Sequence, residues 1–231
     1  MAEITTAGAD LSAPAENRWI APEFAAVLQE RGYIEDALTV APADVADIDE
    51  VNVSGDPESG GSISSLRGIE HFKSLRSLDC SFNRIAAIDL SGNPLLAELY
   101  CHYNLLTELD LSANGRLATL VCSRNDISLL DVSRNPFLSE LNCDRNRLAV
   151  LDLKCNLQLT GLVCDTNLLT ALDISANRGL EVLVCIDNPG ENGMFKVKSP
   201  FESASIPSDS FTTEPWEYGG SEVRIEYIKE L

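Results

Sequence analysis

The sequence predicts a mainly-β repeat solenoid, and three observations predict it. Leucine recurs every 21 residues from Leu75 to Leu180, and a second leucine column runs from Leu78 to Leu183. A cysteine column and an asparagine column keep the same spacing. Inside each unit, apolar and polar residues alternate over short stretches, which is the period of a β-strand. Self-similarity at a fixed period of this length is typical of stacked coils, each of which buries its apolar side against its neighbours.

The unit reads L-x-x-L-x-C-x-x-N-x-[LI]-x-x-[LI]-D-[LVI]-[SK]-x-N-x-x, in five full copies and a sixth partial one. It resembles the leucine-rich repeat, with cysteine in the third apolar slot, and is similar to the internalin-like or Bacteroidetes-type repeats of bacteria. The resemblance covers roughly residues 18–188 and implies a right-handed coil. The L-D-L stretch repeats the spacing of the first half of the unit, so we expect two short strands per 21-residue turn, on opposite sides of a rather straight stack.

Ahead of the repeats, residues 1–17 are expected to form a disordered leader and residues 18–74 an N-terminal cap. Pro22 to Arg31 predicts a short amphipathic helix, because Pro stands in its first turn and Gly32 follows it. Ile48 to Val53 predicts a first irregular strand, and the Gly/Ser/Pro-rich stretch from Ser54 to Ser62 predicts an exposed loop. No basic and apolar signal segment begins the sequence, so it is either cytoplasmic or an extracellular or cell-surface protein whose export signal has been removed.

Residues 75–188 form the repeats, and two inward columns are expected to be structural. Buried, reduced cysteine packs as a small hydrophobe, and thiols one per coil are poorly placed for disulfides or for a zinc site. Inward asparagine is expected to hydrogen-bond the backbone where each coil turns. The ladders are Cys80, Cys101, Cys122, Cys143, Cys164 and Cys185, and Asn83, Asn104, Asn125, Asn146 and Asn167, continued by Asn188. Cys155 lies outside the column, so we expect it to be exposed.

Residues 189–231 predict a β-type C-terminal cap. The 21-residue period ends at Pro189 and Gly190, and two strand-like stretches follow, Phe195 to Lys198 and Val223 to Ile228. A cap of this kind hides the open edge of the last coil. A small attached module or a piece of a longer chain is the alternative.

Charge and composition exclude several function classes. The formal net charge of -19 disfavours nucleic acid, and no apolar run is long enough to span a bilayer. With two histidines and no catalytic constellation, we expect no enzyme and no cofactor. An aspartate column, one per coil, is expected to accept hydrogen bonds from serine or from corner amides, and calcium between coils is the alternative. It consists of Asp89, Asp110, Asp131, Asp152 and Asp173.

Outward positions of the first strand vary from coil to coil, and these positions predict a binding surface. They form a ribbon of aromatic residues followed by arginine, the residue types enriched where proteins bind. The candidate residues are Phe82, Tyr100, His102, Tyr103, Arg124 and Arg145. We therefore expect a monomeric, protein-binding module with an unidentified protein partner, and the resemblance implies a bacterial surface or secreted protein. A carbohydrate-binding module with the aromatic residues as stacking platforms and a structural spacer are the alternatives.

Overall fold

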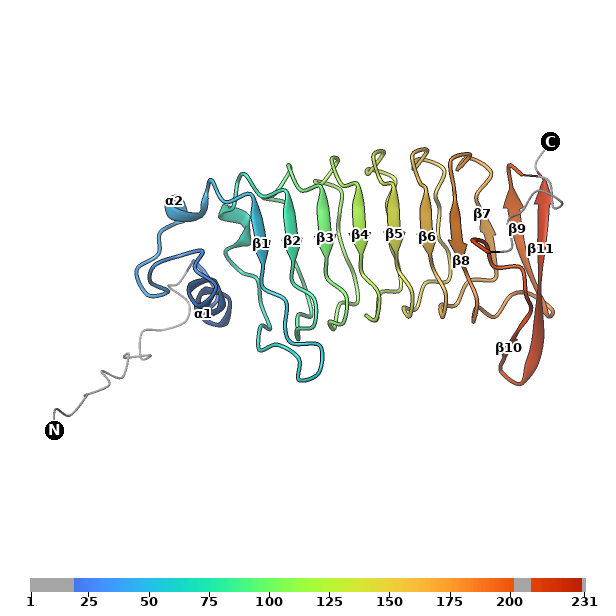
Figure 1. The fold of residues 1–231 in the computed structure, drawn as a ribbon, viewed down its shortest axis with the longest axis horizontal. Coiled ribbons are helices and arrows are strands. Elements are labelled where there is room, and N and C mark those ends of the chain that lie inside the picture. Colours follow the sequence, from blue (N-terminus) through green and yellow to red (C-terminus); the bar gives the residue numbers. More distant parts are fainter. Residues whose placement is uncertain (1–18, 202–208, 230–231) are drawn as a thin grey trace.

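A computed structural model describes residues 19–201 and 209–229 of the chain. It is an elongated stack of coils, with helices at the N-terminal end and a small β-structure at the other end (Figure 1). The leader expected at residues 1–17 lies outside the described residues. The predicted class, a mainly-β repeat solenoid with an open sheet, is confirmed.

One parallel sheet runs along the stack and contributes one strand per coil. Its strand order is β1-β2-β3-β4-β5-β6-β8. Leu78 pairs with Leu99 and Leu99 pairs with Leu120, so each coil meets the same position of the next. The strands are β1 (Glu50–Asn52), β2 (Ser77–Asp79), β3 (Glu98–Tyr100), β4 (Thr119–Val121), β5 (Glu140–Asn142), β6 (Gly161–Val163) and β8 (Val182–Val184). We call the outward side of this sheet the front face.

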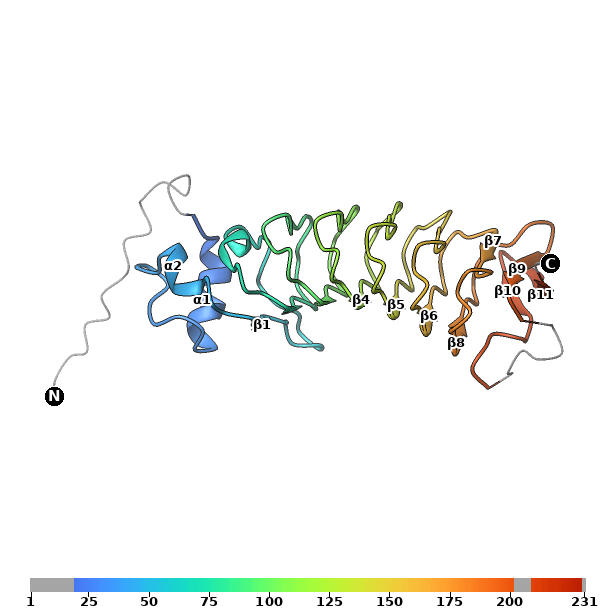
Figure 2. The same ribbon diagram turned by 90° about the horizontal axis from the view of Figure 1, so that it is seen from above.

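The prediction of a second strand in each turn is wrong for most coils. Opposite the sheet, a strand forms only in the last repeat, as β7 (Ala171–Asp173), with an isolated bridge from Asp152 to Asp173. The equivalent stretches of the earlier coils, which we call the back segments, form no strand in the described structure. Ser128 N donates to Thr107 O at 3.4 Å between two of these segments, but no ladder follows in the described structure, and hollows lined by successive coils lie over this side. Figure 2 shows the sheet on one side of the stack and β7 on the other.

Helices cover the N-terminal end of the stack. Helix α1 (Pro22–Glu30) ends one residue earlier than predicted and buries Phe24 and Leu28. The Phe24 ring packs on Phe72, with 5.9 Å between ring centroids. Two short elements that the pattern did not predict, α2 (Pro42–Val45) and the 3-10 helix η2 (Ile69–His71), complete this end. Their apolar residues therefore shield the first coil from water.

The C-terminal end extends the stack on the back side only. A four-stranded sheet has the order β10-β11-β9-β7, built from β9 (Met194–Ser199), β10 (Trp216–Tyr218) and β11 (Ser221–Lys229). Strand β9 runs parallel to β7. On the front side, residues 210–212 cover the edge of β8, because Leu183 N donates to Ser210 O and Thr212 N donates to Leu183 O. Both open edges of the last coil are thus paired.

Two columns fill the interior at fixed positions. All six ladder cysteines are buried and free, and Cys155 is free and exposed. Asn125 shows the asparagine geometry: its Nδ2 donates to Cys101 O at 3.0 Å and to Cys122 O at 3.1 Å, and its Oδ1 accepts from Leu106 N at 2.9 Å. Each asparagine therefore joins two neighbouring coils and pairs backbone groups that would otherwise be buried without partners.

Candidate functional site

Five of the six candidate residues do not lie on the strands, which corrects the sequence interpretation of them as outward strand positions; only Tyr100 is on a strand. Phe82, Tyr103, Arg124 and Arg145 follow the strands and adopt left-handed backbone conformations, with φ between 51° and 54°. Each non-glycine residue in this region costs about 1–2 kcal/mol. An inter-coil bond holds each turn, as where Tyr103 N donates to Ser123 O at 3.0 Å, and the ladder asparagine follows immediately.

The left-handed turn aims the four side chains into one row along the stack, which we call the aromatic–arginine ridge. The rings of Phe82 and Tyr103 stack, with 4.6 Å between centroids and an interplanar angle of 18°. His102 meets Phe82 edge-on at 5.0 Å and Tyr103 at 5.9 Å. Tyr103 keeps 41% of its surface exposed, so the stack offers an aromatic side chain to solvent. Tyr100, on β3, is half-buried and precedes His102 by two residues in the sequence. Its ring makes no contact with this cluster in the described structure.

Arginine continues the ridge beyond the aromatic rings. The Arg124 guanidinium carbon lies 4.7 Å from the centroid of the Tyr103 ring, a cation–π contact. In the next coil, Arg145 Nε lies 3.4 Å from Asp144 Oδ2. Across residues 19–201 and 209–229, Arg124 itself has no carboxylate within 4.0 Å. The ridge therefore carries one exposed guanidinium that is oriented by an aromatic ring and not neutralised by a carboxylate.

Titratable groups between the strands and the ridge are shifted by burial. Burial lowers the pKa of His102, against the opposing pull of Asp79 and Asp144, so the ring is neutral at pH 7. Its Nδ1 is buried and has no hydrogen-bond partner in the described part of the chain. Burial, and secondarily the neighbouring Asp144, raises the pKa of Asp165. The His102 ring in the aromatic cluster is thus neutral, with the carboxylates of Asp79 and Asp144 near enough to act on its pKa.

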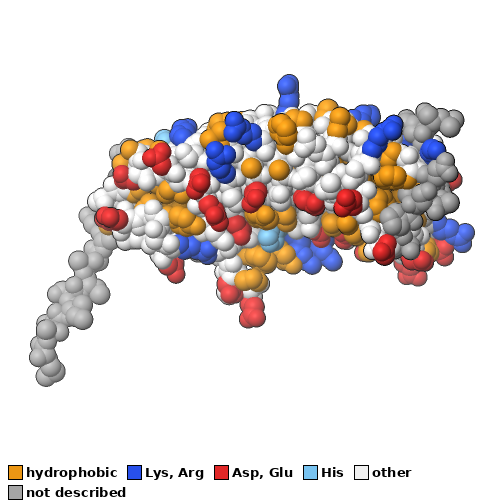
Figure 3. Space-filling view, turned by 45° about the horizontal axis from the view of Figure 1, so that its top comes forward, with side chains coloured by type: hydrophobic (Ala, Val, Ile, Leu, Met, Phe, Trp, Pro, Cys, Tyr) orange, Lys and Arg blue, Asp and Glu red, His pale blue; other side chains and the backbone are white. Residues whose placement is uncertain are grey.

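The far end of the front face is aliphatic, a feature that the ribbon of candidate residues did not include. Val182 and Ile186 are 41% and 38% exposed, and Val163 and Val184 are partly exposed beside them. The front face therefore changes along the stack from aromatic, through arginine, to aliphatic. In Figure 3, acidic side chains run in a row along the middle of the molecule, with hydrophobic groups above and below.

The described residues contain no cluster of the side chains that usually hold a metal ion. No group of three His, Cys, Asp or Glu side chains in residues 19–201 and 209–229 converges as metal ligands would. Burial raises the pKa of the ladder thiols, to about 12 for Cys122, so they are not nucleophiles at neutral pH. The chemistry available on the front face is that of non-covalent contact by aromatic, guanidinium and aliphatic groups.

The fold and the site together define a leucine-rich-repeat solenoid with an exposed, chemically varied sheet face. Its structural neighbours are internalin-like leucine-rich repeat proteins. The internalin InlF of Listeria monocytogenes matches with a TM-score of 0.60 at 19% identity, over 78% of this chain and 65% of that one. The leucine-rich repeat protein LIC12759 of Leptospira interrogans matches with a TM-score of 0.53 at 21% identity, over 67% of this chain and 47% of that one.

A third structure, the functional domain of InlJ from Listeria monocytogenes, which includes a cysteine ladder, is 25% identical over 78% of this chain and 55% of that one, with a TM-score of 0.35. The chain thus spans about half to two thirds of the length of these proteins. No protein-family model and no curated protein matches the sequence. None of the helices described in the structure has the length and apolar character needed to cross a membrane.

Proposed function

We propose that this chain is a non-enzymatic protein-binding module that contacts its partner through the front face. The stack of Phe82, Tyr103 and Arg124 is the observation that carries the proposal. Aromatic and arginine side chains dominate binding energy in protein interfaces, and here they are oriented before the partner arrives. Because the sheet and the turns are held by inter-coil bonds, little conformational entropy is lost on binding. The partner we infer is a protein that presents a carboxylate to Arg124.

The test compares variants of the ridge with matched variants elsewhere. A partner captured with the wild-type protein is purified, and its dissociation constant is measured by calorimetry. Tyr103→Ala and Arg124→Ala should each weaken binding about tenfold or more, which is about 1.4 kcal/mol. Phe137→Ala and Arg116→Ala remove an exposed aromatic ring and an exposed guanidinium from outside the ridge, and should leave binding unchanged. Equal affinities for all four variants would contradict the proposal.

Carbohydrate binding is the second candidate function, and the exposed ring of Tyr103 favours it. A flat aromatic ring that is stacked on a second ring provides a platform for the apolar face of a sugar. A glycan array separates the two functions: binding that Tyr103→Ala abolishes and Arg124→Ala retains would favour the glycan, since a neutral sugar does not need the guanidinium.

The setting that we propose is the bacterial surface or the extracellular space, in which case an export signal precedes or was removed from this sequence. The resemblance of the repeats to internalin-like proteins supports this proposal. Fractionation of cells that express the natural gene, followed by detection of the protein with an antibody, tests it. Recovery only from the cytoplasmic fraction would refute it.

A further inference from the structure

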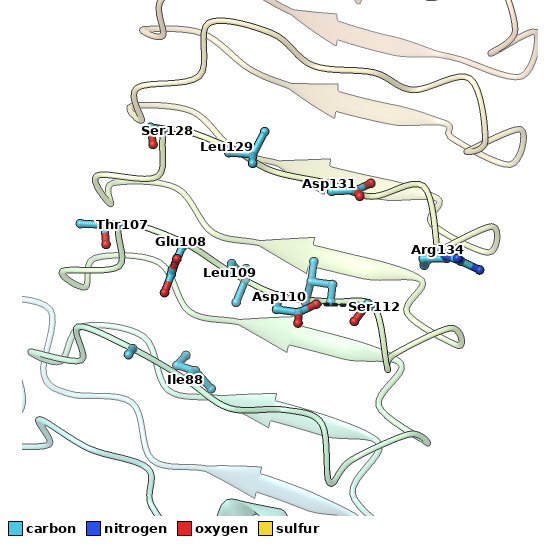
Figure 4. A pocket seen from close by; sticks show the side chains of 12 residues that line it. Ile88, Thr107, Glu108, Leu109, Asp110, Ser112, Ser128, Leu129, Asp131 and Arg134 are labelled. Carbon is cyan, nitrogen blue, oxygen red and sulfur yellow. Dashed lines mark hydrogen bonds between the residues drawn. The ribbon is translucent and has the colours of Figure 1, made fainter.

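The back of the solenoid holds a hollow with a volume of about 710 Å³. Its walls come from three successive coils: Ile88 from one, Leu109 and Asp110 from the next, and Leu129 and Asp131 from the third (Figure 4). It lies over back segments that form no strand in these coils, and so on the opposite side of the stack from the aromatic–arginine ridge.

Two exposed aliphatic side chains, which we call the apolar column, stand at the same position of neighbouring coils on this back surface. They are Leu129 and Val150, and their exposed fractions, 72% and 71%, are the highest among the large exposed hydrophobic residues of the described chain. The same position carries Glu108 in the coil before and Ala171 in the coil after. The pair offers apolar surface to a partner.

The aspartate column runs beside the apolar column, two residues further along each back segment. The backbone amide two residues on donates to each carboxylate, for example Ser112 N to Asp110 Oδ1 and Ser133 N to Asp131 Oδ1, both at 2.9 Å. Hydrogen bonds from the hydroxyl and the amide of Ser133 lower the pKa of Asp131, so its charge persists at neutral pH. In the described coils, Asp89, Asp110, Asp131 and Asp152 have no Lys or Arg nitrogen within 4.0 Å.

In the last coil, an aspartate of the column forms an ion pair with a lysine. Strand β9 lies beside β7, and Lys198 Nζ is 3.7 Å from Asp173 Oδ2. In β9 the buried Phe195 and Val197 alternate with the exposed Lys196 and Lys198. The C-terminal end of the chain thus supplies a basic, amphipathic segment to the one aspartate of the column that has a Lys or Arg nitrogen within 4.0 Å in the described residues, while Arg134 acts on Asp131 from a greater distance.

We propose that the back surface binds a basic amphipathic helix of a partner protein. Its aliphatic stripe would cover Leu129 and Val150, and its Lys or Arg side chains would pair with the aspartate column. A helix fits because one of its faces can present an aliphatic stripe with Lys or Arg side chains beside it, recurring with each turn of about 5.4 Å. This site is independent of the front face and is compatible with simultaneous binding there.

The test uses a synthetic helical peptide of about 15 residues with leucine at every third or fourth position, lysine on the neighbouring face, and alanine and glutamine elsewhere. Binding to the full chain is followed by calorimetry and by amide chemical shifts. We expect shifts at the back residues Thr107–Ser112 and Ser128–Arg134, and not at Phe82, Tyr103 or Arg124. The same peptide with glutamate in place of lysine should not bind, because the aspartate column repels it.

Variants locate the contact. The double variant Leu129→Ser/Val150→Ser should weaken binding about tenfold or more, and Asp110→Asn/Asp131→Asn should weaken it and reduce its salt dependence. The control double variant Leu105→Ser/Leu168→Ser removes two exposed leucines, 54% and 44% exposed, from another column and should bind normally. Because all the replaced side chains are exposed, circular dichroism should show unchanged folding. Equal loss in the control, or amide shifts confined to the front face, would overturn the proposal.

Discussion

At the scale of the single residue, the asparagine ladder combines two tasks. Each side chain satisfies the backbone of its own turn and of the preceding coil, as Asn125 does with Cys101 O and Cys122 O. The turn contains a non-glycine residue in the left-handed region, Arg124 in this coil. The ladder therefore stabilises the backbone conformation that orients the ridge, so the structural column and the candidate binding residues depend on each other.

Replacing Asn125 tests this dependence. Asn125→Ala leaves several buried backbone groups without partners, so the free energy of unfolding should fall by about 3 kcal/mol. Urea denaturation measures the change. Asn142→Ala, which removes a half-buried asparagine of the next coil whose side chain accepts one hydrogen bond, from Asp144 N, should cost less than about 1 kcal/mol. Similar losses for the two variants would show that the ladder has no special role.

At the scale of the element, the C-terminal strands pack on the last coil and stabilise it. Trp216 of β10 packs against Phe195 with 5.7 Å between ring centroids, and its Nε1 donates to Asn188 O at 2.9 Å. Asn188 is the final member of the asparagine ladder. In a solenoid, each coil is stabilised mainly by its neighbours, so loss of the terminal packing affects the nearest coils first.

Trp216→Ala should therefore loosen one end of the molecule. We expect a loss of about 3 kcal/mol of local stability and faster amide hydrogen exchange in β8, with exchange in β2 unchanged. Hydrogen exchange followed by mass spectrometry measures both. Glu217→Ala, which changes the exposed neighbour in β10, should leave β8 protected. Uniform acceleration along the whole stack would contradict the expectation that stability is local.

At the scale of the whole molecule, the buried thiols couple folding to alkaline pH. Burial raises the pKa of Cys122 and of Cys185 from 9.0 to about 12, and raises that of the other ladder thiols as well. A group that holds its proton more tightly in the folded state favours folding fully below pH 9, and this contribution is lost as the pH rises towards 12.

The free energy of unfolding should thus fall steeply above pH 9, by about 1.4 kcal/mol per buried thiol for each pH unit. Cys122→Ala should reduce that slope by about one thiol, whereas Cys155→Ala, at the exposed cysteine, should not change it. Urea denaturation at several pH values between 8 and 11 gives the slopes. An identical slope for wild type and Cys122→Ala would mean that ladder thiols ionise without unfolding.

The sequence by itself determined the period, the parallel sheet, the inward columns and the existence of both ends of the stack. It did so because each inward position meets its own copy in the next coil, which makes the burial of Leu78 or Cys122 a consequence of the repeat alone. The aromatic and arginine residues of the front face were also recognisable, since they are the outward positions that vary from coil to coil.

Tertiary structure alone decided the rest. The back segments have similar sequences in all the repeats, yet among the described residues only β7, with β9 beside it, forms a strand there. The hollow on this side and the exposure of Leu129 were also visible only in the folded stack. Likewise, the left-handed turn at Tyr103 and Arg124 brings ring and guanidinium together across coils. Local alternation could not predict these features, because they depend on the distance and direction between neighbouring coils rather than on the order of residues within one.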